Sequence, residues 1–398
     1  MNPGRLARLG SVAMLAALVA GCANDAPQDT WQPAGENAQK IHDLQWPVFL
    51  VAGLVGVAVF GVLFYALWRY RDTGQPIPKQ IHGRPKLEIG LTILPAVILI
   101  FVAVPTVGTL IDLADTDDTD CIINVTGQQW WWEIDYPVQD GCGGISEPII
   151  TSGQMVIEVG TNVIVRGTSR DVIHSWWIPR LNGKRDMVPG RVHTNRLQAE
   201  APGIYAGQCT EFCGLSHANM RMEVIAMEHD DFEAWKANQL EAYAAPEPES
   251  LAAEGESTFI SQCARCHQVN GLENSDGELI IARPDLNVWS GAAPNLTKLM
   301  TRNTFAGASF DLLSDVCRPL VWEAPSDLVG ERYNEGVSAD CLNEVDLREW
   351  LRNPPAKKPM YTDPTKLEAT NGLPRGMPFL ALSEDQIDQL IAYLLERK

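Results

Sequence analysis

Two long apolar runs stand out in the first third of the chain. Neither the stretch from Pro47 to Trp68 nor that from Ile89 to Ile111 contains a charged residue. Each reaches the length of about 20 apolar residues that crosses a hydrocarbon core about 30 Å thick. The pattern therefore predicts a transmembrane hairpin of two helices over residues 47–111, with buried core helices of a soluble domain as the alternative.

The loop between these runs carries more basic than acidic side chains. The charged residues are Arg69, Arg71, Asp72, Lys79, Arg84, Lys86 and Glu88. Because short, positively charged loops stay on the cytoplasmic side of a membrane, both flanks of the hairpin are expected on the outer side.

The N-terminus has the pattern of a secretory signal. Two arginines are followed by a short apolar run and small residues, a run too short to span a bilayer. Cysteine directly after Ala-Gly resembles the lipobox of bacterial lipoproteins, which would place a lipid on Cys22. Residues 1–22 are thus expected to be a signal with its lipobox, and residues 23–46 an outer N-terminal segment.

The pattern changes after residue 112. Short segments rich in β-branched and aromatic residues recur with turn signals between them, which indicates an antiparallel sandwich or barrel over residues 112–240. The predicted strands are Cys121–Thr126, Gln129–Tyr136, Met155–Val159, Asn162–Thr168, Gly203–Cys209 and Met220–Met227.

Composition narrows the possible functions. A length of 398 residues leaves room for two or three domains. A net charge of −19 argues against nucleic-acid binding, and it fits either attraction of a basic protein partner or plain solubility. The nine cysteines form two close pairs and two wide pairs besides Cys22, an inventory that suits an oxidising compartment.

The first close pair lies in a segment that also offers an imidazole and a thioether. Cys209, Cys213, His217 and Met220 follow one another within one predicted loop. Thiolate and thioether ligands select copper, and a β-sandwich with His, Cys and a weak Met has the blue-copper ligand set. The additional cysteine exceeds what one copper uses, whereas two thiolates can bridge two coppers.

A copper pair needs a second histidine. His174 lies in an earlier strand-like segment and is the natural candidate, with His193 as its rival. A Cys209–Cys213 disulfide is one alternative, but it leaves the His and Met of the loop without a role. Structural zinc is another, although zinc does not call for Met.

A second outer domain is expected over residues 253–398, after a Pro- and Glu-rich linker at 241–252. Cys263, Cys266 and His267 form the Cys-x-x-Cys-His motif that attaches c-type haem, with a redox disulfide as the alternative for the two cysteines. A Met should complete the iron coordination. Met377 is the best candidate and Met360 its rival.

The C-terminal segment resembles class I cytochromes c, which implies an all-α domain. The resemblance rests on the haem motif, on Ala293–Thr297, on Leu347–Leu351 and on a final helix with apolar spacing. The segment from about 310 to 345 exceeds what a minimal cytochrome needs. The wide cysteine pairs, Cys121 with Cys142 and Cys317 with Cys341, are possible disulfides by parity and compartment.

From about Trp46 to Met227 the chain resembles subunit II of haem–copper cytochrome c oxidases. The resemblance is carried by the copper loop, His82–Glu88, Gly127–Trp132, His174–Trp176 and Met187–Arg191. Two departures are Leu91, where the family often has Trp, and Gln128, where many members have His. The family fold implies a cupredoxin-like Greek-key sandwich after the transmembrane hairpin.

The resemblance implies roles for particular residues. A dinuclear copper centre (CuA) would be bound by His174, Cys209, the carbonyl of Glu211, Cys213, His217 and Met220. The Glu211 carboxylate would also help to bind magnesium at the contact with subunit I. Trp130 matches the aromatic that receives electrons, with a packed core indole as the alternative. Glu88 matches a carboxylate at the mouth of a proton path, with an ordinary helix-start carboxylate as the alternative.

With a fused cytochrome, the layout resembles caa-type terminal oxidases of bacterial cell membranes, with both metal domains on the outer side. A cytochrome c or a cytochrome bc complex would reduce the haem. The electron would pass through CuA to subunit I, which reduces oxygen with proton pumping in a complex that includes subunit III. The alternatives are the small subunit of a CuA-containing nitric oxide reductase and a membrane-anchored electron carrier without a catalytic partner.

Overall fold

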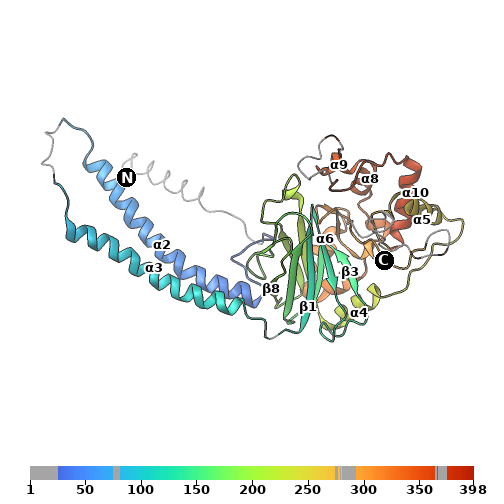
Figure 1. The fold of residues 1–398 in the computed structure, drawn as a ribbon, viewed down its shortest axis with the longest axis horizontal. Helices are drawn as coiled ribbons and strands as arrows, with labels where there is room; N and C mark the ends of the chain where they lie inside the picture. Colours follow the sequence, from blue (N-terminus) through green and yellow to red (C-terminus); the bar gives the residue numbers. More distant parts are fainter. Residues whose placement is uncertain are drawn as a thin grey trace, which may run out of the picture.

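The computed structural model describes residues 26–74, 81–117, 119–273, 277, 279, 293–363, 365 and 374–398. A long helical hairpin projects from a globular body, in which a β-sandwich lies nearer the hairpin and a helical region lies beyond it (Figure 1). The expected signal at 1–22, with Cys22, lies outside the described residues. The layout of hairpin, sandwich and helical region is the one predicted from the sequence.

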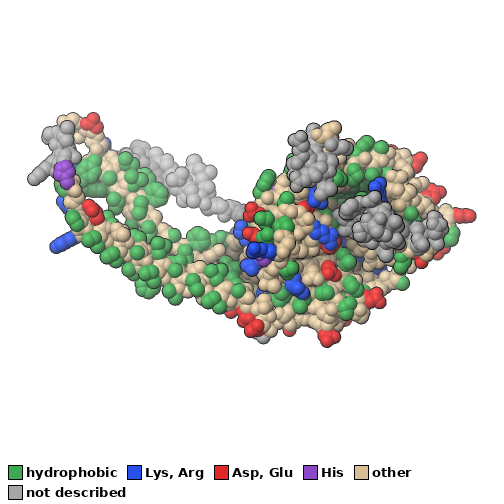
Figure 2. All heavy atoms as spheres, in the orientation of Figure 1, with side chains coloured by type: hydrophobic (Ala, Val, Ile, Leu, Met, Phe, Trp, Pro, Cys, Tyr) green, Lys and Arg blue, Asp and Glu red, His purple; other side chains and the backbone are tan. Residues whose placement is uncertain are grey.

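The hairpin consists of α2 (Glu36–Arg69) and α3 (Pro85–Leu113). Each helix contains an 18-residue stretch with a mean hydropathy of 2.6, and both are long and apolar enough to cross a membrane. Their surfaces are covered with apolar side chains, and basic side chains lie at the end far from the globular body (Figure 2). The two predicted spans lie inside these helices.

Helix α2 begins at Glu36, well before the predicted span. Its first turns therefore form the second half of the predicted outer N-terminal segment. These turns pack on the sandwich rather than standing apart. The backbone N–H of Ala34 donates to the carbonyl of Arg180 at 2.7 Å. The buried amide of Asn37 donates to the carbonyl of Arg196 at 2.9 Å. The hairpin is therefore fastened to the sandwich by hydrogen bonds as well as by the chain itself.

The sandwich has a five-stranded sheet in the order β3-β2-β1-β5-β8 and a three-stranded sheet in the order β4-β10-β9, with a β6–β7 hairpin at one end. The strands are β1 (Cys121–Gln128), β2 (Trp131–Tyr136), β3 (Ile149–Ser152), β4 (Gln154–Glu158), β5 (Val163–Ser169), β6 (His174–Trp176), β7 (Arg185–Met187), β8 (His193–Leu197), β9 (Gly203–Gln208) and β10 (Arg221–Met227).

A purely antiparallel arrangement, as expected from the sequence, is wrong for two pairs of strands. β1 runs parallel to β5, and β4 runs parallel to β10. The chain leaves the large sheet after β3, forms β4 in the small sheet, and returns as β5 beside β1. Such a crossover brings two strands together in the same direction, which hairpin connections cannot do.

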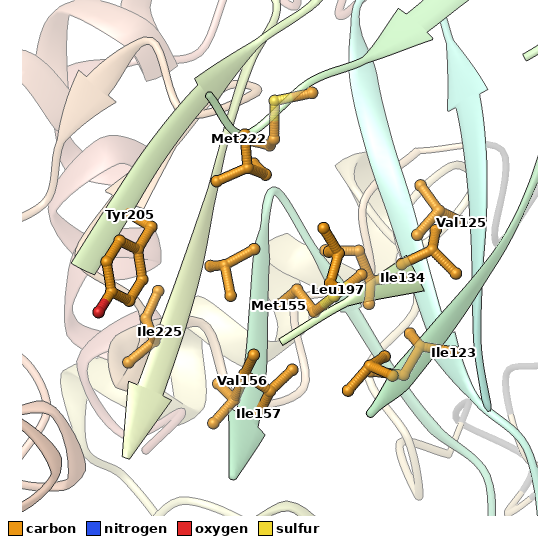
Figure 3. Packing of buried hydrophobic residues seen from close by; sticks show 14 of the residues in the cluster. Ile123, Val125, Ile134, Met155, Val156, Ile157, Leu197, Tyr205, Met222 and Ile225 are labelled. Carbon is orange, nitrogen blue, oxygen red and sulfur yellow. The ribbon is translucent and has the colours of Figure 1, made fainter. Parts of the chain in front are cut away.

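Side chains from both sheets meet in one apolar core (Figure 3). Burial alternates along β1, where Ile123 and Val125 point inward, as expected of a strand with one covered face. By contrast, β10 is buried at every position after Arg221. The small sheet must therefore be covered on its second face as well.

The C-terminal region covers that second face. Val329 and Tyr333 of α7 belong to the apolar core of the sandwich rather than to the core of their own region. They come from the segment at about 310–345, to which the sequence alone assigns no function. This extra segment is therefore a docking element.

The C-terminal region pairs its first and last helices, α5 and α10, around a second apolar core. Ser383 and Gln386 form the capping box predicted at the start of α10. The expectation of an all-α domain misses one short β-hairpin. The elements after the sandwich are α4 (His229–Gln239), α5 (Leu251–Gln262), β11 (Thr304–Phe305), β12 (Phe310–Asp311), α6 (Arg318–Trp322), α7 (Val329–Asn334), α8 (Glu344–Arg352), α9 (Pro354–Lys357) and α10 (Glu384–Leu395).

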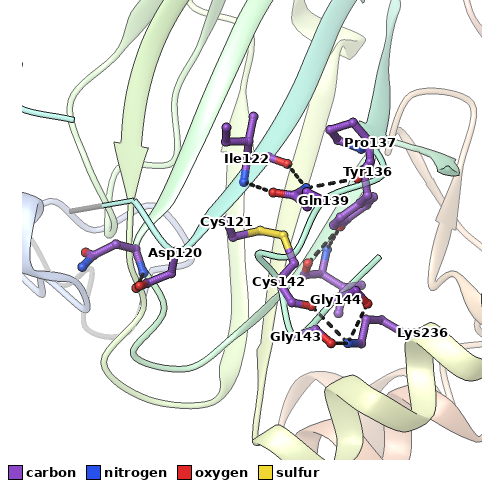
Figure 4. Close-up of a disulfide and its surroundings, with 12 residues drawn as sticks. Asp120, Cys121, Ile122, Tyr136, Pro137, Gln139, Cys142, Gly143, Gly144 and Lys236 are labelled. Carbon is purple, nitrogen blue, oxygen red and sulfur yellow. Dashed lines mark hydrogen bonds between the residues drawn. A yellow bond between two sulfur atoms is a disulfide. The ribbon is translucent and has the colours of Figure 1, made fainter. Parts of the chain in front are cut away.

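Two disulfides join the wide cysteine pairs, Cys121 to Cys142 and Cys317 to Cys341. The first ties the start of β1 to the loop after β2 (Figure 4). Beside it, the buried ammonium of Lys236 in α4 donates to the carbonyls of Cys142 and Gly143 at 3.0 and 2.8 Å. The disulfide loop is thus held by both a covalent bond and a helix.

A buried polar network crosses the contact between the two regions. The Gln154 side chain of β4 accepts hydrogen bonds from the Tyr333 hydroxyl at 2.9 Å and the backbone N–H of Asn303 at 3.1 Å. It also donates to the carboxylate of Glu223 in β10. Glu223 is only 5% exposed, and this burial raises its pKa to about 7.

Replacing the Glu223 carboxyl with an amide should remove its pH-dependent contribution to the free energy of unfolding. A carboxyl whose pKa is raised on folding stabilises the folded state below its ordinary pKa of 4.5, and that contribution is lost as the pH rises through about 7. The shift corresponds to about 3 kcal/mol. Glu223→Gln should match the parent in thermal unfolding at about pH 5 and exceed its melting temperature at about pH 8. Glu247→Gln, in the exposed linker, is the control; equal melting temperatures for Glu223→Gln and the parent at both pH values would contradict the prediction.

Candidate metal centre

The structure gathers the four candidate ligand residues of the copper loop at one end of the sandwich. Cys209 and Cys213 lie in the loop after β9, and their Sγ atoms are 3.7 Å apart. His217 opens the short 3-10 helix η1 (His217–Asn219), and its Nδ1 lies 3.5 Å from the Cys213 sulfur. Met220 directly precedes β10, and its Sδ lies 3.8 Å from the same sulfur.

The other sulfur has its own set of neighbours. His174, at the start of β6, places Nδ1 3.9 Å from the Cys209 sulfur. The backbone carbonyl of Glu211 lies 3.3 Å from that sulfur. The ligand atoms of His174, Cys209 and Cys213 are buried and lie within 4.8 Å of one another, a geometry that could hold a metal ion. Each sulfur therefore has one imidazole beside it, and the two imidazoles are those of His174 and His217, the two histidines named from the sequence.

The rival histidine has a different partner. His193 lies in β8, where its Nδ1 bonds to the carbonyl oxygen of Asp186 at 2.6 Å. The structure thus places His174, and not His193, in the buried cluster.

A buried carboxylate orients His174, and the sequence analysis gave it no role. Asp171 Oδ1 lies 2.8 Å from His174 Nε2, and both side chains are at most 3% exposed. If Nε2 carries the proton and donates it to Asp171, Nδ1 has a free lone pair toward the sulfurs. The sequence gives no sign that Asp171 and His174 pair. They are three residues apart, and whether their side chains meet depends on how the chain bends before β6.

Hydrogen bonds decide the charge of this pair. Burial alone would raise the pKa of the Asp171 carboxyl, but the bond to His174 and those from the N–H groups of Gln129 and Val172 lower it. Burial alone would lower the pKa of His174, but its bonds to Asp171 and Cys209 raise it. The two side chains therefore stabilise each other's charge within an apolar surrounding.

The two thiols affect each other in opposite directions. The hydrogen bond between the two sulfurs lowers the pKa of Cys209, with further help from His174. The hydrogen bond to Cys209 in turn raises the pKa of Cys213, and burial adds to the effect. The opposite directions mean that ionisation of one thiol disfavours ionisation of the other.

The carbonyl of Cys213 is fixed by two donors. The Trp130 indole N–H donates to it at 3.1 Å, and the Gln129 side chain donates at 2.7 Å. The next residue is Gly214, with φ of +108°, where a Cβ would lie 2.8 Å from Gln129 Nε2. A glycine is needed here for both its backbone conformation and the close approach. Trp130 is thus a buried side chain bonded directly to the loop of the cluster.

The sequence also predicts roles for the side-chain carboxylates of two glutamates. The Glu211 side chain is partly buried beside the cluster. Glu88 lies in the first turn of α3, where its carboxylate accepts a hydrogen bond from the backbone N–H of Arg84 at 2.9 Å. Magnesium binding by Glu211 and a proton-path role for Glu88 stay predictions.

The haem-attachment motif follows α5. Cys263 and Cys266 are free thiols. The Nδ1 of His267 bonds to the carbonyl of Pro294 at 2.8 Å. If Nδ1 donates this bond, Nε2 has a free lone pair for a metal, the usual arrangement for an axial histidine. Burial lowers the pKa of His267, which favours the neutral imidazole that such binding requires.

The two candidate axial methionines pack in different places. Met377 packs against the core of the C-terminal region, whereas Met360 packs against the core of the sandwich. Their segments are nonetheless neighbours, since the N–H of Arg375 donates to the carbonyl of Tyr361 at 2.8 Å. Packing therefore favours Met377 as the partner of a haem in the C-terminal region.

The comparisons with known proteins cover nearly the whole chain. The family model for the cytochrome c oxidase subunit II transmembrane domain matches residues 26–108, and the model for its periplasmic domain matches residues 121–227. Cytochrome c oxidase subunit 2 of Alkalihalophilus pseudofirmus is 31% identical, over 97% of this chain and 96% of the relative. The same subunit of Bacillus sp. strain PS3 is 31% identical, over 97% of this chain and 95% of the relative.

A solved structure, the periplasmic domain of subunit II of cytochrome oxidase of Bradyrhizobium japonicum, is 29% identical with a TM-score of 0.28, over 32% of this chain and 96% of that chain. The two family matches make the chain a two-span membrane protein whose sandwich lies on the periplasmic side. From the full-length relatives and both family models it follows that the chain belongs to the cytochrome c oxidase subunit II family and carries a C-terminal extension.

Proposed function

We propose that the cluster at the end of the sandwich binds a dinuclear copper centre, the CuA centre that the family implies. The observation that carries this proposal is the two sulfurs 3.7 Å apart, each with its own imidazole. His174, Cys209, Cys213, His217, Met220 and the carbonyl of Glu211 would hold the metals. Soft sulfur ligands with imidazole nitrogen suit copper.

We further propose that the C-terminal region binds a c-type haem through Cys263, Cys266, His267 and Met377. The free thiols and the hydrogen bond that leaves His267 Nε2 available support this proposal. When bound, the haem and the copper pair supply one-electron redox chemistry at two places in one chain. The protein's own part is to fix the ligands, exclude water and hold the two sites together.

As subunit II of a terminal oxidase, the chain assembles with other oxidase subunits in a membrane complex. The proposed task is to take electrons from an external cytochrome c or cytochrome bc complex and deliver them to subunit I, with subunit III in the same complex. The relatives favour this task over the nitric oxide reductase subunit and over the free electron carrier.

The remaining proposals concern placement. The C-terminal region would lie on the outer side with the sandwich, because it packs on that domain through a shared buried core. Domain limits of 112–240 and 253–398 with a linker at 241–252 fit the end of α4 at Gln239 and the start of α5 at Leu251. A magnesium ion at Glu211, a proton path at Glu88 and a lipid on Cys22 complete the proposal.

Metal analysis of the purified oxidase complex tests the copper proposal. The expected result is a copper pair assigned to this chain, with an electron paramagnetic resonance signal that shows one electron shared by both nuclei. His217→Ala should abolish that signal, and His193→Ala should leave it unchanged. A single-copper signal in the parent, or zinc in place of copper, would sink the dinuclear site.

The Asp171 carboxylate should strengthen copper binding through His174. Asp171→Ala removes the acceptor that orients the imidazole, and such outer partners are worth about 10- to 100-fold in metal affinity. The measurement is copper retention against a graded chelator, with Asp186→Ala on the exposed β7 as control. Equal retention in the parent and Asp171→Ala would show that the bond to His174 has no role in binding.

Substituting each of the two candidate axial methionines, Met377 and Met360, in turn shows which of them binds the haem iron. Met377→Leu should convert the haem from low spin to high spin and lower its reduction potential, because the thioether is lost. Met360→Leu should leave the haem spectrum unchanged, since that side chain packs on the sandwich. Optical and electron paramagnetic resonance spectra of both variants decide, and the opposite pattern would make Met360 the ligand.

A further inference from the structure

The segment after α9 brings the C-terminal region directly onto the indole of Trp130, which the family resemblance predicts to receive electrons. Tyr361 packs on Trp130 with ring centroids 5.2 Å apart and an angle of 46° between the rings. Trp130 is only 2% exposed in the whole chain. An external protein could therefore touch this indole only after the C-terminal region had moved away.

Tyr361 also reaches the copper loop itself. A Cβ built on Gly214 would lie 3.4 Å from Trp130 Cζ2 and 3.5 Å from Tyr361 Cε2, so the two rings and this glycine surround one point. Gly214 directly follows Cys213, whose carbonyl accepts the Trp130 indole N–H at 3.1 Å. A continuous line of contacts thus runs from Tyr361 through Trp130 to a proposed copper ligand.

On its other side, Tyr361 is tied to the proposed haem ligand segment. Its backbone pairs with that of Arg375, two residues before Met377. Arg375 Nε in turn lies 4.0 Å from the Asp171 carboxylate, which holds His174. The same short segment therefore touches the surroundings of both proposed redox sites.

Lys358 fixes the backbone beneath this contact. Its side chain is buried, with the residue only 3% exposed, and burial lowers its pKa to about 7. Nζ donates to the carbonyl of Trp130 at 2.9 Å, to the carbonyl of Ala306 at 2.6 Å and to Ser309 Oγ at 3.3 Å. A buried amine is tolerated only with such partners, and here one partner is the backbone of the indole residue.

The surrounding turn is shaped to receive this amine. Ala306, Gly307 and Ala308 all have positive φ, a conformation that is unfavourable for a non-glycine residue. A Cβ on Gly307 would lie 2.4 Å from the Trp130 carbonyl. Ser216 of the copper loop also donates its hydroxyl hydrogen to the carbonyl of Pro359, next to Lys358. The segment is thus locked to the sandwich from several directions.

We propose that Tyr361 is the internal electron-entry contact of this subunit, occupying on Trp130 the place of an external donor, and that Lys358 is the positioning residue that holds the two rings together. The inference rests on the proposed copper and haem sites. With both groups bound, one electron would pass from the haem to the copper pair; no bond would form or break, and neither ring would be oxidised or lose a proton. The rings shorten the gap that the electron must cross.

The test uses the purified oxidase complex and a flash-generated one-electron reductant of the haem. Tyr361→Leu should slow electron arrival at the copper pair severalfold, whereas Tyr361→Phe, which keeps the ring, should restore the parent rate. The control is Tyr333→Phe, an interdomain tyrosine bonded to Gln154 and not to Trp130. Equal rates in the parent and Tyr361→Leu would overturn the proposal.

Hydrogen exchange gives a readout independent of electron flow. Lys358→Met should raise amide exchange around residues 129–132 and 358–361 and slow the same electron step, with the copper and haem spectra unchanged. If Lys358→Met left both amide exchange and the electron-transfer rate unchanged, the proposed role of Lys358 would be overturned. If Tyr361→Leu altered the copper spectra, Tyr361 would instead be a structural residue of the copper site. Metal and haem content of the parent are measured first, so that a missing cofactor counts against the proposed function and not against this inference.

Discussion

The site depends on how it accommodates the charges of two buried sulfur atoms, those of Cys209 and Cys213, which lie 3.7 Å apart. Two thiolates at about 4 Å repel each other by about 4 kcal/mol at the effective dielectric of a protein site. The opposite pKa directions of Cys209 and Cys213 reflect this repulsion, because the two thiols do not ionise independently. Cations shared by both sulfurs would remove the repulsion and let both thiols ionise.

The surroundings of the sulfurs follow from that constraint. The Asp171–His174 pair, the two donors on the Cys213 carbonyl and the glycine at 214 all fix atoms that would otherwise rotate toward or away from the metals. When the ligand atoms keep the same positions before and after the site changes its charge, little structural rearrangement accompanies that change. This is the physical condition for a centre that gains and loses electrons quickly.

The C-terminal region is joined to the sandwich by buried contacts rather than only by its linker. Tyr333 and Val329 lie in the sandwich core, and the Gln154 network and Lys358 cross the same boundary. The segment at 310–345, for which the sequence offers no function, supplies α7 to this contact. Its presence explains why β10 is buried on both faces.

Much of this architecture could be predicted from local patterns. Charge-free runs identified the hairpin. Segments rich in β-branched and aromatic residues placed most strands within one or two positions, and the spacing from Cys209 to Met220 anticipated the cluster with His174. Features that depend on distant parts of the chain could not be predicted. Asp171, Lys358 and Tyr361 gain their partners only through folding, and the parallel pairs of β1 with β5 and β4 with β10 arise from a crossover that no local pattern encodes.

Anomalous diffraction at the copper absorption edge, on crystals of the oxidase complex, tests the central claim most directly. The account predicts two adjacent copper peaks between the sulfurs of Cys209 and Cys213, one beside His174 and the other beside His217. A single peak, or none at this position, would contradict it.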